Sequence, residues 1–260
     1  MPKLAANISM LFRELHFQDR FAAAARAGFR HVECQFPYEW PAAMLAQAAR
    51  GAGVNVVLHN LPAGDLAAGE LGIACHPGRE EEFRAGTERA IDYARQLGCT
   101  RLNCLAGIAP SGIDRNALLA TLVRNLRWAA ARLSEEGIEL LVEPLNTRTV
   151  PNFFLNRSDA AVELFELVAS PNLRLQYDVF HMQIMEGDLA NRIERLLPRI
   201  GHIQIADVPR RNEPGTGEIN YPFLLDHIDR LGYAGWIGCE YNPSGDTVSS
   251  LGWARPYLPT

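Results

Sequence analysis

The stretch "IELLVEPLN", residues 138–146, decides the fold class of this chain. Leu140, Leu141 and Val142 read as a short strand that is apolar on both faces, as the strands of parallel sheets are. The strand then ends in a carboxylate, Glu143, and a proline follows at once. A buried carboxylate is costly unless it is paired, hydrogen-bonded or bound to a metal. The stretch therefore predicts a parallel sheet with a polar site where this strand ends.

Similar apolar runs alternate with amphipathic segments along the chain. The expected strands are residues 3–9, 31–36, 54–60, 101–107, 138–144, 173–180, 201–207 and 235–241. Helical patterns include residues 17–28, 80–98, 116–137 and 158–169, and glycines stand where helices should end at residues 28, 98, 137 and 232. Eight alternating units in 260 residues predict an α/β fold, a single (β/α)8 TIM barrel over residues 1–260. An open doubly wound sheet is the alternative, but the chain lacks its glycine-rich phosphate-binding motifs.

Composition narrows the possible partners and chemistry. The net charge of −5 and the lack of a basic run argue against nucleic acid as the main partner. No stretch reaches the roughly 18 apolar residues of a membrane span, so a cytoplasmic protein without a membrane partner is expected. Five cysteines without a C-x-x-C pair argue against a disulfide framework or a zinc cage. Lys3, at the start of the chain, is the only lysine, which argues against Schiff-base chemistry.

Four oxygen-bearing side chains share one position in the predicted barrel. Side chains alternate along a strand, and this alternation points Glu143, Asp178, Gln204 and Glu240 inward at the ends of four consecutive strands. TIM barrels keep their active sites at this end. Three carboxylates in one mouth require a cation or large pKa shifts. Oxygen donors suit Mg²⁺, or Mn²⁺, rather than zinc. The four residues are therefore predicted metal ligands.

Two other readings of these four residues are open. Each is an ordinary polar rim residue if taken alone. Glu143 and Glu240 also fit the acid and nucleophile of a glycosidase. That reading leaves Asp178 and Gln204 without a role, so the metal site is preferred.

Four further residues are expected to contact a substrate. His181 follows the sixth strand and is suited to polarise a substrate oxygen or carry a proton. His59 ends the third strand and is a weaker candidate. Asp207 and Arg210, with Arg211 beside them, lie on the loop after strand seven, where an arginine would clamp an anionic substrate. The alternative is that the two histidines only pack against their neighbours and that the two arginines are solvated, so that neither type contacts a substrate.

Several motifs resemble a known family. They are "AANISMLF" (5–12), "LHNLPAGDLAAGE" (58–70), "QYDVFHMQ" (176–183), "EPGTGEINY" (213–221) and "GWIGCEY" (235–241). Together they are similar to the hydroxypyruvate isomerases, which belong to the xylose-isomerase-like barrels alongside ketose 3-epimerases and endonuclease IV. The resemblance runs over nearly the whole chain, from residue 5 to about residue 253.

The resemblance implies a function and roles for the predicted ligands. It implies that the four ring residues hold the metal, and that Glu143 and Glu240 move a proton through an enediolate between hydroxypyruvate and 2-hydroxy-3-oxopropanoate. A 2-oxo-tetronate isomerase is the alternative within this class, and a non-catalytic sugar-acid binding protein is the alternative outside it. A ketose 3-epimerase is disfavoured because Gln204 stands where histidine is expected.

One position departs from the family pattern. The sequence "EYNP" places Asn242 where the pattern has a lysine. If that lysine binds the substrate carboxylate, the role passes here to Arg210 or Arg211. The expected partner is a small hydroxy or oxo acid, and the sequence leaves room for a homo-oligomer.

Overall fold

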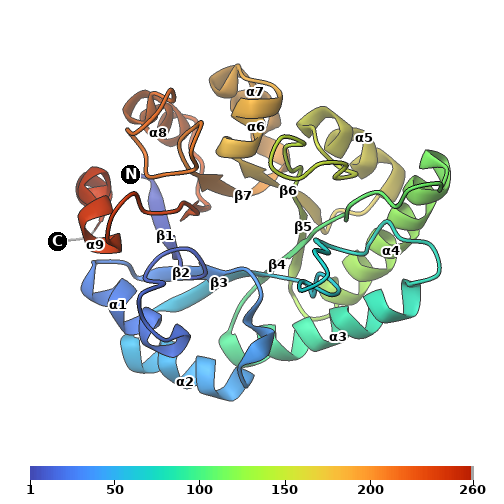
Figure 1. The fold of residues 1–260 in the computed structure, drawn as a ribbon, viewed down its shortest axis with the longest axis horizontal. Coiled ribbons are helices and arrows are strands. Elements are labelled where there is room, and N and C mark those ends of the chain that lie inside the picture. Colours follow the sequence, from blue (N-terminus) through green and yellow to red (C-terminus); the bar gives the residue numbers. More distant parts are fainter. Residues whose placement is uncertain (259–260) are drawn as a thin grey trace.

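Eight parallel strands close into a barrel in the computed structural model, which describes residues 1–258 (Figure 1). The strands are β1 (Lys3–Asn7), β2 (His31–Cys34), β3 (Asn55–Asn60), β4 (Arg101–Cys104), β5 (Glu139–Val142), β6 (Leu173–Asp178), β7 (Ile200–Ile205) and β8 (Trp236–Cys239). Each strand pairs with the next, and β8 pairs with β1 to complete the ring. The predicted TIM barrel is confirmed.

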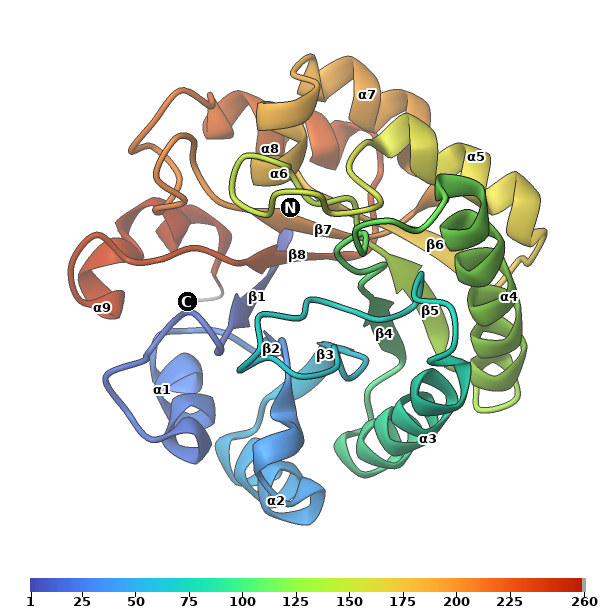
Figure 2. The same cartoon turned by 45° about the vertical axis from the view of Figure 1, so that its right-hand side comes forward.

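Helices surround the barrel on its outside, as Figures 1 and 2 show. They are α1 (Arg20–Arg26), α2 (Ala42–Ala52), α3 (Glu80–Leu97), α4 (Arg115–Ser134), α5 (Ser158–Val168), α6 (Val179–Met185), α7 (Leu189–Leu196), α8 (Tyr221–Arg230) and α9 (Thr247–Ser250). Short 3-10 turns lie at residues 17–19, 37–39, 197–199 and 252–257. Within residues 1–258, none of the helices combines the length and apolar character that crossing a bilayer requires.

The two faces of the strands pack into different cores. Leu140 and Val142 point outward into the large core beneath the helices, whereas Leu141 joins a small cluster inside the barrel. The next inward position on this strand is Glu143. The apolar cluster thus fills the lower barrel, and the polar side chains begin above it.

The opposite end of the barrel is built differently. Lys3 opens β1 there, is exposed, and donates from Nζ to the carbonyl of Ala234 at 3.1 Å. The strands run from this floor toward the mouth, where the loops that carry polar residues begin. Function is therefore expected at the far end from Lys3.

The long loop after β3, residues 61–79, folds firmly onto the loop after β4. Gly72 donates to the carbonyl of Ala63 at 2.9 Å, and Arg79 pairs with Glu70. Gly72 has φ +97°, and a Cβ built there would lie 2.2 Å from the carbonyl oxygen of Leu105. A glycine is thus required both by the backbone conformation and by the close approach of the neighbouring loop.

Two glycines of this loop provide a matched test. Gly69 has a similar φ of +85°, but a Cβ there meets nothing within 4 Å. Gly69→Ala should lower the free energy of unfolding by about 1–2 kcal/mol, the cost of a left-handed residue. Gly72→Ala should cost roughly 1–3 kcal/mol more because its Cβ also collides with backbone. Urea unfolding would measure both, and equal losses would contradict the close packing of the two loops.

Candidate active site

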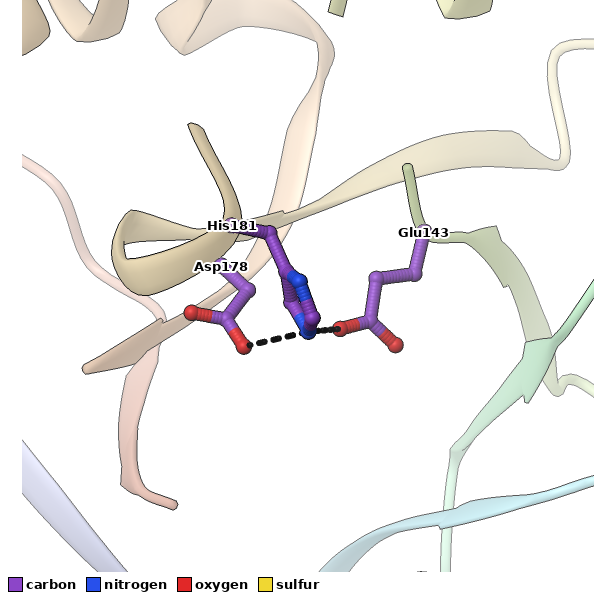
Figure 3. A group of neighbouring side chains, drawn as sticks. All are labelled: Glu143, Asp178 and His181. Carbon is purple, nitrogen blue, oxygen red and sulfur yellow. Dashed lines mark ion pairs between the residues drawn. The ribbon is translucent and has the colours of Figure 1, made fainter. Parts of the chain in front are cut away.

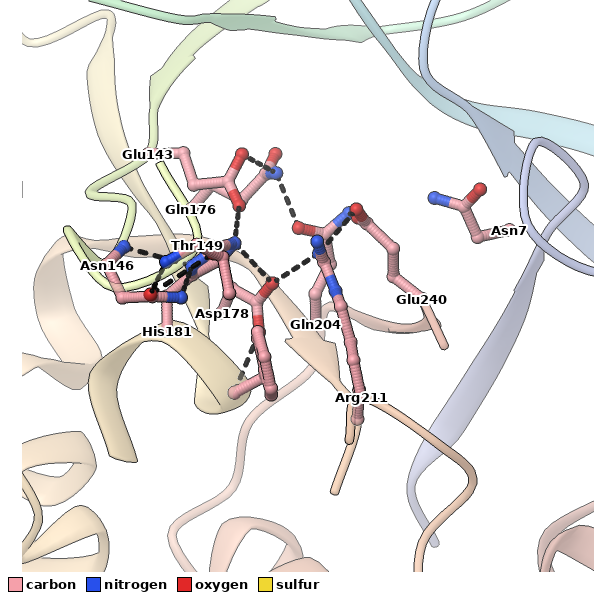
Figure 4. Close-up of polar contacts among 12 residues, drawn as sticks. Asn7, Glu143, Asn146, Thr149, Gln176, Asp178, His181, Gln204, Arg211 and Glu240 are labelled. Carbon is pink, nitrogen blue, oxygen red and sulfur yellow. Dashed lines mark hydrogen bonds and ion pairs between the residues drawn. The ribbon is translucent and has the colours of Figure 1, made fainter. Parts of the chain in front are cut away.

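The four predicted ring residues meet at the mouth of the barrel (Figure 4). Glu143 follows β5, Asp178 ends β6, Gln204 lies in β7 and Glu240 follows β8. Their side chains are almost fully buried, with 1–4% of each residue exposed. The inward direction expected from strand alternation therefore brings these side chains together.

Two glutamines connect the glutamates across this ring. Gln176 Nε2 donates to Glu143 Oε2 at 2.9 Å and to Gln204 Oε1 at 2.6 Å. Gln204 Nε2 in turn donates to Glu240. Glu143 and Glu240, on strands three places apart, are thus joined by a continuous chain of amide hydrogen bonds (Figure 4).

The ring carboxylates are hard to ionise together. Burial raises the pKa of Glu143 well above its usual value, and the charges of Glu240 and Asp178 raise it further. Burial also raises the pKa of Asp178, and it raises the pKa of Glu240 to about 8 although Arg211 acts in the opposite direction. A bound cation would relieve both the burial and the repulsion, so the donor set fits a divalent metal.

Arg211 is the cation that the chain itself places against the ring. Its Nη2 donates to Asp178 Oδ2 at 3.2 Å and to Glu240 Oε1 at 2.8 Å. Its guanidinium lies 5.1 Å from the centre of the Phe180 ring. Its backbone is left-handed, with φ +58°. A non-glycine residue in this conformation is strained by about 1–3 kcal/mol, a cost found mainly at functional sites.

Arg210, the predicted clamp, does not reach the site. It is exposed, and the described part of the chain offers it no hydrogen bond or ion pair. The left-handed turn at Arg211 carries the chain around so that the second arginine, not the first, enters the mouth. The structure therefore does not support the substrate contact predicted for Arg210, and the arginine beside the ring is Arg211.

His181 lies beside two ring carboxylates, those of Glu143 and Asp178 (Figure 3). Its Nδ1 accepts from the backbone N–H of Asn146 at 3.0 Å. Burial lowers the pKa of His181 well below its usual value, so the ring is neutral and its proton resides on Nε2. That atom lies 3.5 Å from Asp178 Oδ2 and 4.0 Å from Glu143 Oε1.

The position of His181 raises the question of whether it is a metal ligand. Ligand atoms of Glu143, Asp178 and His181 all lie within 4.8 Å of one another, which is close enough to share one ion. A ring nitrogen that carries a proton has no lone pair to give to a metal. The hydrogen bond from Asn146 therefore favours His181 as a donor to oxygen over His181 as a ligand.

His59 is predicted to contact the substrate, and the structure corrects this. It pairs in register with Leu102 and lies on the outer face of β3, with no exposed surface. Its Nδ1 lies 3.3 Å from the hydroxyl of Tyr38, and burial lowers its pKa to about 4. The inner position belongs to Asn60, which accepts from Asn103 at 3.2 Å.

Asp207 is also predicted to contact the substrate, but its carboxylate is fully used elsewhere. It is buried and accepts four backbone N–H groups at 2.9–3.1 Å, from residues 208, 215, 217 and 219. These bonds fold the loop after β7, which carries Arg211. Asp207 therefore positions that loop and has no free oxygen directed at a ligand.

Three residues outside the predicted site also contact the ring. Asn103 donates to Glu143 Oε2 at 2.9 Å, Gln35 donates to Glu240 Oε1 at 2.8 Å, and Gln176 lies between the two glutamates. Each is a polar residue in or directly after an apolar strand, as Glu143 is. A polar residue at an inward position predicts a site contact wherever it occurs in a barrel strand.

Comparison with known proteins places this arrangement among similar enzymes. The family model described as a xylose isomerase-like TIM barrel matches residues 21–257. Hydroxypyruvate isomerase of Escherichia coli K12 is 50% identical over 257 residues, covering 99% of this chain and all of the relative. A 2-oxo-tetronate isomerase of Cupriavidus necator is 48% identical and covers 99% of both chains.

A solved structure agrees in fold and sequence. The crystal structure titled "AP endonuclease, family 2" from Brucella melitensis superposes with a TM-score of 0.97 at 46% identity, over the full length of both chains. A D-psicose 3-epimerase structure has a TM-score of 0.78 at 17% identity and shares the fold alone. With a closed barrel, a matching family model and close relatives over its whole length, the chain belongs to the xylose isomerase-like TIM barrel family.

Proposed function

We propose that this protein isomerises small 2-oxo-3-hydroxy acids, with hydroxypyruvate and 2-hydroxy-3-oxopropanoate as the substrate pair. The observation that carries the proposal is the ring of Glu143 and Glu240 with Asp178 and Gln204 between them. Relatives at 48–50% identity that are named for this chemistry support it. The reaction moves one proton between C3 and C2 and redistributes a proton between their oxygens, so no atom is gained or lost.

A divalent cation is part of the proposal. Glu143, Asp178, Gln204 and Glu240 would hold it, with Mg²⁺ preferred and Mn²⁺ the alternative, because all four donors are oxygens. The burial of these side chains and the raised pKa values of Glu143 and Glu240 support a cation at this position. When bound, the ion would supply Lewis-acid polarisation of the substrate oxygens.

The two glutamates are proposed as the proton carriers. One takes the proton from the carbon that bears the hydroxyl group, and the other delivers a proton to the neighbouring carbon. Their placement on strands three apart lets them approach a planar enediolate from different sides. His181, neutral and with its proton on Nε2, is suited to donate a hydrogen bond to the oxygen that gains negative charge.

Arg211 is proposed to bind the substrate carboxylate. Its Nε is buried with no hydrogen-bond partner among the described residues, so its guanidinium fork is only partly used. Asn242 carries no charge and is tied to the same loop, since its N–H donates to the carbonyl of Arg211 at 2.8 Å. The arginine would therefore take over the charge that a lysine at position 242 would provide.

The alternatives differ in what they predict. A 2-oxo-tetronate isomerase would use the same residues on an acid with one more carbon. A sugar-acid binding protein would bind without turnover. The nuclease name of the Brucella structure finds less support here, because the chain has a net charge of −5 and the ring is rich in carboxylates rather than histidines.

Proton NMR in D₂O tests the proposed reaction directly. Hydroxypyruvate with enzyme and Mg²⁺ should isomerise and exchange its carbon-bound proton with solvent, because the proton passes through a carboxylate. The same measurement on 2-oxo-tetronate ranks the two substrates by kcat/KM. Line broadening by binding without exchange or isomerisation of either acid would identify a binding protein and overturn the enzyme.

The two proton carriers provide the control for this experiment. Glu143→Gln and Glu240→Gln should each lower kcat by about 10² to 10⁴, the usual contribution of general acid–base catalysis. Metal content must be measured in each variant, since loss of the ion would also lower the rate. Near wild-type kcat in either variant would remove that glutamate from the mechanism.

The two adjacent arginines form a second matched pair. Arg211→Lys keeps the charge but loses the planar fork, so kcat/KM should fall by about 10- to 100-fold, the equivalent of roughly 1.5–3 kcal/mol. Arg210→Lys changes an exposed residue without partners and should stay within about twofold of wild type. Equal kinetics for the two variants would show that the carboxylate binds elsewhere.

Stability of the metal-free protein should depend on pH. Because the pKa of Glu240 is raised to about 8, the folded state binds more protons than the unfolded state between about pH 4.5 and pH 8. Stability should therefore fall as the pH rises through this window. Mg²⁺ at one fixed concentration, 100-fold over its Kd at pH 8, should raise the thermal midpoint by about 5 °C at pH 8, and by less at pH 5, where the protonated carboxylates bind it more weakly. Parallel curves with and without Mg²⁺ would contradict binding at these carboxylates.

A further inference from the structure

A fourth carboxylate lies directly beneath the ring. Glu33, on β2, has no exposed surface. Its Oε1 accepts from Asn7 Nδ2 at 2.9 Å and from Gln204 Nε2 at 2.8 Å. Its Oε2 lies 2.6 Å from His202 Nε2. Both oxygens are thus occupied by side chains from β1 and β7, and the carboxylate touches a ring residue without belonging to the ring.

A glycine on β8, on the far side of β1, leaves room for this carboxylate. A Cβ built on Gly238 of β8 would lie 2.2 Å from Glu33 Oε2 and 2.4 Å from Oε1. Any side chain at this position would displace the carboxylate. The barrel therefore accommodates the Glu33 carboxylate by having a glycine at position 238.

Glu33, together with Glu240, decides which way the Gln204 amide faces. The two ends of a carboxamide have nearly the same shape, so only the hydrogen-bond partners distinguish its nitrogen from its oxygen. Glu33 and Glu240 both accept from one end of Gln204, and that end must be the NH₂ group. The carbonyl oxygen then faces Gln176 and the Glu143 side of the ring (Figure 4).

We infer that Glu33 is a positioning residue that holds the Gln204 carbonyl oxygen toward the ring so that it can serve as a metal ligand. The inference rests on the proposed metal role of Gln204. A flipped amide would direct two N–H groups at the cation and remove one of its four ligands. Glu33 itself contacts neither substrate nor metal, and it acts through Gln204 alone.

Metal affinity is the property that tests this role. Glu33→Gln has the same shape but can also donate, so one of the two carboxylates that select the amide orientation is lost and only Glu240 remains. Glu33→Asp keeps the charge and withdraws the carboxylate from Gln204. Calorimetric titration of the metal-free variants with Mn²⁺ and Mg²⁺ should show a 10- to 100-fold loss of affinity in both, as for other residues that orient ligands. Asn7→Ala removes a different partner of Glu33 and should stay within about twofold of wild type.

A second variant, Gln204→Glu, separates the effect of Glu33 on amide orientation from the effect of its negative charge. In a Gln204→Glu variant the ligand is a carboxylate, whose two oxygens are equivalent, so no orientation can be lost. In this variant the carboxylates at positions 33 and 204 face each other. Adding Glu33→Gln replaces one of them with an amide donor, so metal affinity should equal or exceed that of the Gln204→Glu single variant. If Glu33 acted only as one more negative charge, Glu33→Gln would weaken binding in both backgrounds, and that result would overturn the inference.

The outcomes also distinguish this inference from the proposed function. If wild-type protein binds neither ion, or if Gln204→Ala binds as well as wild type, the metal role of Gln204 fails and the inference falls with it. If Gln204→Ala weakens binding but Glu33→Gln and Glu33→Asp do not, only the role of Glu33 is overturned. Circular dichroism of the metal-free proteins checks folding. Should Glu33→Gln not fold, Glu33→Asp, which keeps the buried charge, decides the question.

Discussion

Repulsion between carboxylates in a closed mouth is the constraint on which the rest of the site depends. A barrel of eight strands brings the ends of β5 to β8 close together, and three of the four inward side chains there are acids. Their burial removes the water that would otherwise screen them, and the charges of Glu240 and Asp178 raise the pKa of Glu143 further. The surrounding residues supply donors: the amides of Gln35, Asn103 and Gln176, and the guanidinium of Arg211.

The donors around the ring are nearly all neutral, and this is what keeps a cation site open. A second fixed positive charge beside Arg211 would neutralise the carboxylates and compete with a metal. His181 avoids this because burial keeps it neutral and Asn146 fixes its proton on Nε2. Asp207 contributes at a distance, since its four backbone hydrogen bonds shape the loop that delivers Arg211. Charge is thus concentrated in the ring, and neutral groups set its geometry.

The sequence was sufficient for the barrel and the ring, because both follow from periodicity alone. Apolar runs separated by helical patterns predicted the eight strands, and alternation along each strand predicted which polar residues meet. The substrate contact predicted for His59 rested only on its place at the end of β3, and the pairing of β2 with β3 shifts register between Val32 and Glu33. Such a bulge inserts one residue and turns the following side chains to the other face, and no local pattern marks it.

The choice between the two arginines also lay outside what the sequence could predict. Arg210 and Arg211 have the same chemistry, and only the left-handed backbone at Arg211 decides which one enters the mouth. The sequence does carry a signal for the role of Glu33, because Glu33 is an acid in an apolar strand and Gly238 is a glycine within another strand. The sequence alone does not show that the two residues face each other, because this follows from the barrel, which places their strands on either side of β1.

The position of Lys3 has a practical consequence for measurements on this protein. It carries the one side-chain amine in the chain, it is exposed, and it stands at the floor of the barrel, opposite the carboxylate ring. Amine-directed coupling through Lys3 would attach the protein to a sensor surface or a fluorophore at the end away from the mouth. Immobilised molecules would then share one orientation, with their binding sites facing solution, and no engineered tag would be needed.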